Sequence, residues 1–407
     1  MAHALSITDG TTTVSLSTTN FMLLQFNPNT PIYRNGSYEP VTESIELNAY
    51  GATASASLTV IHSVELLLAA AIRRQERQTG PRVYLNYTID GGSQYRTEVL
   101  NGAVVLGQDA MRSYNTKNMA CTLVVEHVPH WEGAETTLLS SQAITNADGS
   151  NSYYTASTVH GTLPTPCKIS VKNTGLAAIF RHIHIGVNAF NTPASFDGTL
   201  GSKTLTITSP TDYGTNQASW TPTGAQLLAM NGDYFRFVAA FTGGATLGVS
   251  YRFELEFNAT TTVTHTSQVT ATTDNYYVMD MGAMAMPAIF DDTAGGSSTI
   301  TINAYSAATD GSDSLTFVQM FPADNYRHLY DTTTVETNDS IIDDGIEDEA
   351  YHDVGSTNRQ TVQAHGNPLL LYPGQAHRFS LLTESTSYDA TKTQAITVSY
   401  RPRRLTV

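Results

Sequence analysis

Two histidines, His182 and His184, stand two positions apart in an apolar segment that is expected to form a strand. Alternate side chains of a strand point to the same face, so this spacing places both imidazoles together. Imidazoles bind transition metals, but a structural site needs three or four ligands, and no patterned third ligand lies nearby in the sequence. The sequence therefore favours a pair of imidazoles on a solvent-exposed or subunit-facing surface, and predicts no metal.

Carboxylates crowd into residues 339–353, around Gly345. Calcium takes six to eight oxygen ligands, which an acidic loop can supply. The EF-hand spacing is absent, however, and most acidic loops are simply solvated. We therefore expect an exposed excursion from a sandwich, and we retain four carboxylates as calcium candidates. These are Asp343, Asp344, Glu347 and Asp348.

Aromatic side chains offer a third kind of chemistry, because their flat apolar faces stack on sugar rings. The chain has 21 tyrosines and 2 tryptophans. Tyr213, Trp220 and Tyr234 lie near one another in the sequence and are the candidate glycan contacts. The alternative is that these rings fill a core or a domain junction.

Motifs of common enzymes are absent from the sequence. It contains no Gly-x-Ser-x-Gly, His-Glu-x-x-His, phosphate-binding glycine loop or Cys-x-x-Cys. The two carboxylates of a glycosidase need no fixed sequence spacing, so hydrolysis stays open, although nothing in the sequence recommends it. We predict no catalytic residue, no cofactor and no enzymatic activity.

Composition limits the class of protein. A chain of 407 residues is expected to hold two or three domains, and its 41% hydrophobic content suffices for proper cores. A net charge of −15 argues against nucleic acid or an anionic membrane as a partner. The basic run at residues 401–404 is expected to be a solvated end or a subunit contact. Cys121 and Cys167 lie in apolar segments and are expected to pack as small hydrophobic groups.

The start of the chain, MAHALSITDG, lacks the basic region and apolar core of a secretory signal. No apolar stretch that approaches 18 residues is expected, so the sequence predicts no membrane span. Charged residues make up only 14%, and Thr, Ser, Ala, Asn and Gly replace them, as in many extracellular and virion proteins. This combination fits a protein that is released by lysis.

A change of hydrophobic period marks the N-terminal third. Val41–Tyr50 alternates as a strand, residues 57–78 carry an apolar stripe at helical spacing, and residues 83–89 alternate again. Ser55 or Ser57 can cap the helix, and Leu67 and Leu68 are expected in its buried face. With further strands near 95–106 and 119–126, residues 1–140 are predicted to form a sheet covered by one long helix.

This region resembles the assembly domain of phage tail proteins, in particular the distal tail protein of siphophages and its tail-tube relatives. The resemblance rests on VTESIELNAYG, VELLLAAAIRR, the following Pro-x-Val-Tyr-Leu strand, and the Pro/Trp segment at 128–132. It covers about residues 1–135 and implies a ring-forming homo-oligomer. It also implies other tail proteins as partners and a location in the tail of the virion.

The remaining two-thirds contains a weak internal repeat. The pattern Leu-Leu, Gly, Arg-Phe at 227–237 recurs at 369–379, and Val-Ser-Tyr-Arg ends each block, at 249–252 and 398–401. With strands separated by turns and no helical stripe, this predicts two tandem jelly-roll-like β-sandwiches at 152–262 and 275–407. The fold class is thus mainly β, with an N-terminal α+β domain.

The repeat carries detailed expectations. Gly232 and Gly374 should occupy equivalent turns, and the Val-Ser-Tyr-Arg strands should pair beside the Arg-Phe strands. Adjacent strand residues face opposite sides. The apolar members should therefore point inward and the basic ones outward, namely Phe237 and Phe379 against Arg236 and Arg378. The acidic segment should have no counterpart in the first copy.

The sequence is interpreted as a structural component of a phage tail, distal-tail or baseplate-like, whose sandwiches contact host glycan. One alternative is a virion decoration or tail-tube subunit that binds no glycan. Another is a secreted lectin or polysaccharide hydrolase. A lectin needs no ring, and a hydrolase would release reducing sugar, so the oligomeric state and an activity assay separate these classes.

Overall fold

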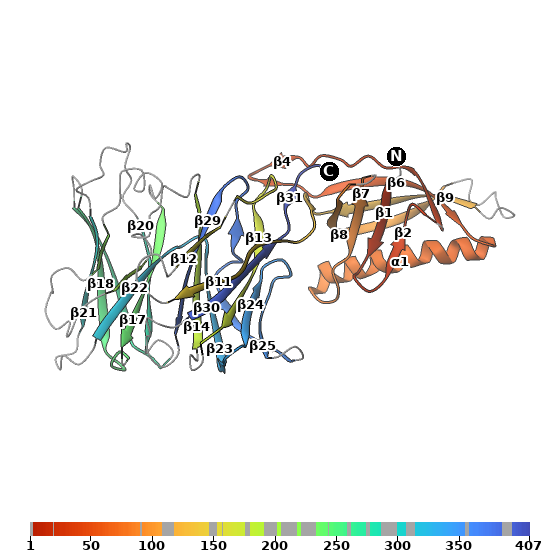
Figure 1. Ribbon diagram of the computed structural model, residues 1–407. Coiled ribbons are helices and arrows are strands. Elements are labelled where there is room, and N and C mark those ends of the chain that lie inside the picture. Colours follow the sequence, from red (N-terminus) through yellow and green to blue (C-terminus); the bar gives the residue numbers. More distant parts are fainter. Residues whose placement is uncertain are drawn as a thin grey trace. The chain divides into compact units, whose positions relative to one another are not determined.

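The computed structural model describes residues 3–18, 20–89, 92–107, 118–145, 153–156, 158–175, 180–190, 202–204, 218–220, 233–242, 244–258, 262–273, 277–285, 299–306, 314–354, 358–384 and 393–407. These residues are mainly β with one helix, as predicted (Figure 1). The chain forms two compact units. Unit 1 contains Met1–Glu135, His160–Leu163 and Arg401–Val407, and unit 2 contains Thr136–Val159 and Pro164–Tyr400.

Unit 1 is built on an antiparallel sheet whose main path has the order β2-β1-β7-β8-β9-β6-β3. Its strands are β1 (Ala4–Thr8), β2 (Thr13–Ser15), β3 (Phe21–Gln25), β6 (Val41–Tyr50), β7 (Tyr84–Thr88), β8 (Gln94–Leu106) and β9 (Asn118–His127). Two short strands, β10 (Trp131–Glu132) and β31 (Arg403–Arg404), pair with each other beside β8. The C-terminal end of the chain therefore belongs to the N-terminal unit.

The helix α1 (Ala54–Arg77) packs one face on this sheet. Its buried stripe includes Leu67 and Leu68, as predicted. The cap is Thr53, whose hydroxyl accepts from the backbone N–H of Ala56, so the proposed caps at Ser55 and Ser57 are wrong. Contact with the sheet is close at Gly102, where a Cβ would lie 2.8 Å from Leu68 Cδ2.

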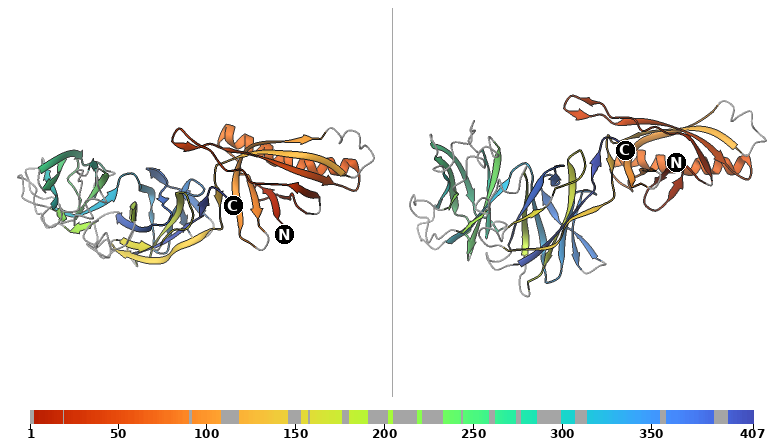
Figure 2. Two further views of the ribbon diagram at one scale, coloured as in Figure 1. Left: turned by 90° about the horizontal axis from the view of Figure 1, so that it is seen from above. Right: turned by 45° about the horizontal axis from the view of Figure 1, so that its top comes forward.

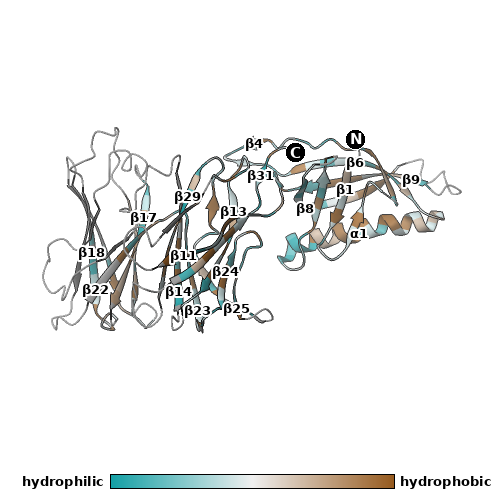
Figure 3. Cartoon of the chain, viewed as in Figure 1, coloured by the Kyte–Doolittle hydropathy of each residue, from teal (hydrophilic) through white to brown (hydrophobic). Residues whose placement is uncertain are grey.

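An 18-residue window of α1 has a mean hydropathy of 1.7, which by length and composition is enough to cross a membrane. The expectation that no apolar stretch approaches this length is therefore wrong. Figure 3 shows the helix as mainly hydrophobic with one hydrophilic end. Its apolar stripe is used inside the protein, where it packs into the core of unit 1 with strands β1, β6, β7 and β9.

Unit 2 begins with a jelly roll, which we call the first jelly roll. One sheet contains β11-β30-β13-β24 and the other β12-β29-β14-β23, the strand order of two interlocked Greek keys. Aliphatic side chains from both sheets form its core, including Ile169, Ile183 and Val398. Its strands are β11 (Thr136–Thr145), β12 (Tyr153–Ala156), β13 (Thr165–Asn173), β14 (Phe180–Phe190), β23 (Tyr326–Val335), β24 (Ser340–Asp344), β29 (Ala376–Glu384) and β30 (Thr393–Tyr400).

Four more strands extend or flank the sheets of the first jelly roll. Strands β25 and β26 continue the first sheet beyond β24, β27 continues the second beyond β23, and β28 pairs with β13. Their bounds are β25 (Glu349–Val354), β26 (Asn358–Thr361), β27 (Gln363–His365) and β28 (Leu370–Leu371).

A second jelly roll is inserted between β14 and β23, and we call it the inserted jelly roll. Its sheets are β15-β22-β17-β20 and β16-β21-β18-β19, the same topology as the first. The rings of Phe241 and Tyr251 meet between these sheets at 5.1 Å. Its strands are β15 (Ser202–Thr204), β16 (Ala218–Trp220), β17 (Tyr234–Thr242), β18 (Ser250–Asn258), β19 (Thr262–Thr270), β20 (Val278–Ala285), β21 (Thr299–Ser306) and β22 (Ser314–Pro322).

Strand pairing corrects the predicted tandem boundaries at 152–262 and 275–407. β12 pairs with β29 and β14 with β23, so each predicted segment contributes strands to the first jelly roll. The two jelly rolls are therefore nested, not consecutive. The predicted boundaries fail because the strands of a sandwich pair across long sequence distances, and a repeated motif does not reveal which distant strands pair.

The repeated motifs lie on non-equivalent strands of the two jelly rolls. The first Arg-Phe pair is in β17, the third strand of its jelly roll, and the second is in β29, the seventh. Each Val-Ser-Tyr-Arg strand lies in the facing sheet, not beside the Arg-Phe strand, and Gly232 lies outside the described residues. Phe237 and Phe379 are buried as expected, but Arg378 is buried too. The repeat is therefore a coincidence of local sequence, although the chain does contain two copies of one topology.

Candidate functional site

Strand β3 forms an apolar edge of unit 1. Its pairing partner is β6, and no strand lies on its other side among the described residues. Met22 and Leu24 alternate along β3 and both are about half exposed. An exposed apolar edge strand presents free backbone donors and acceptors together with apolar side chains, so it is a template for pairing with another chain.

A cavity of about 490 Å³ lies beside this edge. Residues 22–27, from β3 and the segment that follows it, line one side of the cavity. His3 before β1, Ser17 after β2 and Tyr87 of β7 line the other side. Phe26 meets the Tyr87 ring edge-on at 5.2 Å, and the Tyr87 hydroxyl lies 2.9 Å from His3 Nδ1. The sheet thus curves so that its two ends approach each other and leave a partly apolar gap.

Residues 27–40, which we call the arm, project from the end of this edge strand (Figure 2). The tip is a hairpin of β4 (Tyr33–Arg34) and β5 (Ser37–Tyr38). Its turn residues, Asn35 and Gly36, have φ values of 50° and 85°, the left-handed pair that tight hairpins require. Ile32 and Tyr33 are 54% and 61% exposed. The arm therefore holds apolar side chains in solvent on an ordered hairpin.

The base of the arm is fixed to the sheet. The backbone N–H of Asn29 donates to Glu43 Oε1 at 2.8 Å, and its side-chain amide donates to the Thr42 carbonyl at 2.8 Å. Glu43 is buried and lies 3.4 Å from His127 Nε2. Such anchoring reduces the entropy that the arm would lose on binding, so the arm is preorganised for a partner.

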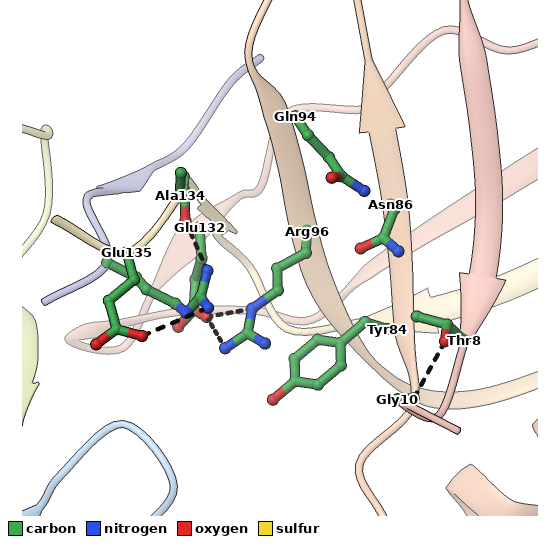
Figure 4. Close-up of a pocket in the computed structure, with 11 residues that line it drawn as sticks. Thr8, Gly10, Tyr84, Asn86, Gln94, Arg96, Glu132, Ala134 and Glu135 are labelled. Atoms are coloured by element: carbon green, nitrogen blue, oxygen red, sulfur yellow. Dashed lines mark hydrogen bonds and ion pairs between the residues drawn. The ribbon is translucent and has the colours of Figure 1, made fainter. Parts of the chain in front are cut away.

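A second cavity, of about 410 Å³, surrounds a charge cluster in unit 1 (Figure 4). Glu132 accepts from Arg96 Nε at 3.2 Å and from Arg403 Nη2 at 3.0 Å. Burial alone would raise the pKa of Glu132, but the hydrogen bond with His130 and the charges of Arg403 and Arg96 outweigh it and lower the pKa to about 2. The cluster is therefore a stable anion held between cations.

The same cluster holds the end of the chain. Arg401 Nη1 donates to the Gly133 carbonyl at 3.2 Å, and the Arg404 guanidinium lies 5.7 Å from the centre of the Tyr95 ring. The basic run at 401–404 was expected to be a solvated end or a subunit contact. That prediction is wrong, because these arginines join β31 to β10 within unit 1. The charge cluster of Glu132, Arg96 and Arg403 is therefore an internal ion-pair network that links β10, β8 and β31, and we call it the clasp.

The calcium candidates do not converge. Asp343 pairs with Arg327 at 3.2 Å and Asp344 with Lys168 at 2.7 Å, and as neighbours on β24 they face opposite sides. Glu347 and Asp348 are exposed. Burial raises the pKa of Asp343 to about 6 despite the nearby Arg327 charge. The segment is a pair of strands, not the solvated loop we expected, and in the described part of the chain no three metal-ligating side chains gather.

His182 and His184 share one face of β14, as predicted, and two histidines from distant strands join them. His328 lies opposite His184 in the register of β23, and His365 lies opposite His328 on β27. We call these four residues the histidine row. No sequence pattern pointed to His328 and His365, because more than a hundred residues separate them from His182 and His184. His184 is buried, so the predicted solvent or subunit surface is wrong for this residue.

The aromatic candidates are tested least. Tyr213 and the side chain of Trp220 lie outside the described residues. Tyr234, at the start of β17, is 59% exposed, so its ring is open to a ligand. Glycan contact stays a prediction.

Cys121 and Cys167 are both buried free thiols, as expected for small hydrophobic groups, and burial raises the pKa of each.

No family model and no curated protein matches the chain. Among solved structures, a chain from the phage P2 baseplate in its activated conformation with Ca is similar at 10% identity and a TM-score of 0.34, covering 100% of both chains. Dimeric latent PorU from Porphyromonas gingivalis is similar at 8% identity and a TM-score of 0.15, over 76% of this chain and 26% of that chain. A chain from infectious bursal disease virus, Gx strain, is similar at 8% identity and a TM-score of 0.13, over 98% of this chain and 63% of that chain. TM-scores this low do not assign a fold family.

Proposed function

We propose that this protein is a non-catalytic structural subunit of a phage tail, of the distal-tail or baseplate kind, which forms a homo-oligomeric ring through unit 1. The observation that carries the proposal is the apolar surface of the arm and of strand β3. Ile32 and Tyr33 on the arm and Met22 and Leu24 on β3 lie in solvent in the single chain. Burying such surface contributes about 25 cal/mol per Å², so a neighbouring subunit is its natural cover.

The order of elements in unit 1 supports the link to phage tails. A strand, β6, leads into the long helix α1, and β7 and β8 follow as a hairpin. The N-terminal segment of unit 1 ends in the short strand β10, in which Trp131 is buried. This is the order that the resemblance to tail assembly domains implies. The location in the virion tail and the contacts with other tail proteins are part of this proposal and rest on that resemblance.

The arm and the β3 edge suggest how subunits join. They are different surfaces, so the arm of one copy against the edge of the next would be a head-to-tail contact. Contacts of this kind close into rings when the rotation between subunits is a simple fraction of a turn. The backbone of β3 would supply hydrogen bonds, and the cavity beside Tyr87 would receive apolar side chains.

A ring would present several copies of the two jelly rolls. Weak contacts of each copy with a host surface would then add up through effective concentration. We assign the glycan contact of the proposal to the inserted jelly roll, where Tyr234 offers an exposed ring. A decoration or tail-tube subunit would assemble without binding glycan, and a lectin or hydrolase would not need to assemble.

The test is the mass of the full-length protein by size-exclusion chromatography with light scattering at tens of micromolar. Wild type should elute as an oligomer of the 44.0 kDa chain. The double variant Ile32→Asp/Tyr33→Asp should be mainly monomeric, because charges on the arm cannot enter an apolar interface. The matched control is Leu66→Asp on the outer face of α1, where Leu66 is 69% exposed.

The control variant should keep the wild-type mass. A monomeric wild type, or an arm variant that stays oligomeric, would refute assembly through the arm. If Leu66→Asp also became monomeric, loss of assembly would not be specific to the arm, and assembly through the arm alone would be refuted.

A further inference from the structure

The two jelly rolls meet through the faces of two sheets within unit 2. The β12-β29-β14-β23-β27 sheet of the first lies against the β15-β22-β17-β20 sheet of the inserted one. Contact is close at Gly186, where a Cβ would lie 2.6 Å from Cδ1 of Phe321. Apolar side chains fill this junction and come from both jelly rolls: Val238, Ala240, Val278, Phe321, Tyr326 and Leu382. We call this contact the junction.

The histidine row runs across the junction face of the first jelly roll. His184 is 3% exposed, stacks on His328 with ring centres 4.4 Å apart, and places Nδ1 2.6 Å from the Tyr326 hydroxyl. His182 Nδ1 lies 3.1 Å from His328 Nε2. The rings of His328 and His365 are stacked at 5.8 Å. Four imidazoles thus share one continuous stack, and the ring of His184 lies 6.4 Å from Phe321 of the inserted jelly roll.

The charged groups around the row are one arginine and two carboxylates, and the other titratable neighbours are phenols. From β17, the Arg236 guanidinium lies 5.0 Å from the centre of the Tyr326 ring and pairs with Asp280 of β20. Tyr330 of β23 stacks on His182 at 4.7 Å. On β29, the backbone partner of His182 is Glu384. In the contacts that the structure describes for His184 and His328, the partners are aromatic rings, imidazoles and one phenol hydroxyl.

This environment opposes protonation of the row. Burial, and then the neighbouring imidazoles and Arg236, hold the pKa of His184 well below its usual value of 6.5. The same causes lower the pKa of His328 to about 3. A proton on either ring would place a cation in an apolar contact beside other bases, and separation of the two sheets would hydrate it.

We propose that the junction is an acid-sensitive hinge, closed while His184 and His328 are neutral and opened when they take up protons. This device concerns the inserted jelly roll alone and does not depend on how unit 1 assembles. Acidification would free two sheet faces, the one that carries His184 on β14 and the one that carries Phe321 on β22. At neutral pH the inserted jelly roll would be held against the first.

The direction follows from proton linkage. Both groups have lowered pKa values in the closed junction and ordinary values when hydrated, so the open form binds more protons. The junction is therefore most stable above about pH 6.5 and weakens as the pH falls. Each histidine that gains a proton on opening raises the opening equilibrium about 10-fold per pH unit, so two raise it about 100-fold.

The test is oxidative (hydroxyl-radical) labelling of the full chain at pH 7.5, 6.5 and 5.5, because separation of the two sheets exposes side chains of the junction while the hydrogen bonds within each sheet stay intact. Labelling of Phe321 and Leu382, which are buried in the junction, should rise about 30-fold between pH 6.5 and 5.5, since a hydrated histidine is already half protonated at pH 6.5. Leu67 and Leu68 of α1 in unit 1 should stay unlabelled. Unchanged labelling of Phe321 and Leu382 would overturn the proposal, and an equal rise at Leu67 and Leu68 would mean global unfolding, which also overturns it.

Variants separate the histidines from other acid effects. His184→Gln/His328→Gln should remove the pH dependence, whereas the control His62→Gln, on the exposed side of α1, should keep it. If the double variant does not fold, His365→Gln serves instead, because removing a neighbouring base should move the opening to lower pH.

Gly186→Ala should give at pH 7.5 the labelling pattern that acid gives in wild type, because its Cβ would lie 2.6 Å from Cδ1 of Phe321. A pH dependence that persists in the double variant, or an opening that does not move in His365→Gln, would refute the role of the histidine row.

Discussion

Units 1 and 2 differ in what they leave exposed. Among the described residues, the exposed large apolar side chains of unit 2 are Tyr234 and Leu247, both in the inserted jelly roll. Unit 1 exposes more, and most of them lie on β3, the arm and the end of β8: Met22, Leu24, Ile32, Tyr33, Leu66, Val105 and Leu106. The two jelly rolls bury the apolar faces of their sheets within one chain. The sheet of unit 1 buries one face under α1, but its apolar edge strand β3 stays open to pairing with another chain. Self-association is therefore expected of unit 1.

The units also differ in how their buried polar groups respond to acid. In unit 1, Glu132 lies between Arg96 and Arg403, and its pKa is lowered to about 2. In unit 2, His184 and His328 are held neutral at the junction. Between about pH 6.5 and 4.5, the junction should weaken while the clasp of unit 1 stays closed.

The largest effect is expected from the core of unit 1. Leu68→Ala should lower the free energy of unfolding of this unit by about 2–5 kcal/mol, because Leu68 is buried against Gly102 of the sheet. Leu66→Ala, two residues away on the exposed side, should stay within about 0.5 kcal/mol. Denaturant unfolding followed by a signal from unit 1 measures both. Equal losses would mean that the buried stripe of α1 is wrongly assigned.

Removal of the clasp anion should come next. Glu132→Gln should cost about 3 kcal/mol, because it leaves Arg96 and Arg403 without their shared carboxylate. The control is Glu39→Gln in the exposed pair with Arg34, which should cost less than about 1 kcal/mol. Since the pKa of Glu132 is lowered when folded, its stabilisation should be complete above about pH 4.5 and fade toward pH 2. A loss of this stabilisation that already begins near pH 6 would contradict the role assigned to Glu132.

A weaker effect is expected at the turn of the arm. Gly36 has a φ of 85°, a conformation that costs an L-residue about 1–2 kcal/mol. Gly36→Ala should therefore weaken self-association about tenfold without lowering the melting temperature of the sheet. Gly10→Ala, at a φ of 88° in another turn of unit 1, is the control and should leave the association constant unchanged. Sedimentation velocity over a concentration series measures both.

The smallest effect is expected at the end of β8. Val105 and Leu106 are exposed but lie away from the arm and the β3 edge in the pairing order. Val105→Thr should change neither the association constant nor the free energy of unfolding by more than about 0.5 kcal/mol. A loss of assembly in this variant would extend the interface across the sheet.

Local patterns in the sequence predicted unit 1 well. The change of period between residues 41 and 89 located β6, α1 and β7, because each of these elements is defined by its own residues. Leu67 and Leu68 were correctly expected in the buried face. The arm was overlooked, although Asn35-Gly36 is a hairpin signal between short polar segments.

The nested order of the two jelly rolls in unit 2 could not be predicted from local sequence patterns. β12 and β29 pair although more than two hundred residues lie between them, and no local pattern records which distant strand is the partner. The Arg-Phe and Val-Ser-Tyr-Arg motifs recur by coincidence, because they lie on non-equivalent strands of the two jelly rolls. His328 and His365 could not be assigned to the histidine row for the same reason.

Assembly through unit 1 can be measured by native mass spectrometry of the full-length protein, with electron micrographs of the same sample. We expect closed rings with a mass that is an integral multiple of 44.0 kDa, and we expect Ile32→Asp/Tyr33→Asp to lose them. Particles of 44.0 kDa at tens of micromolar, in wild type as in the variant, would contradict it.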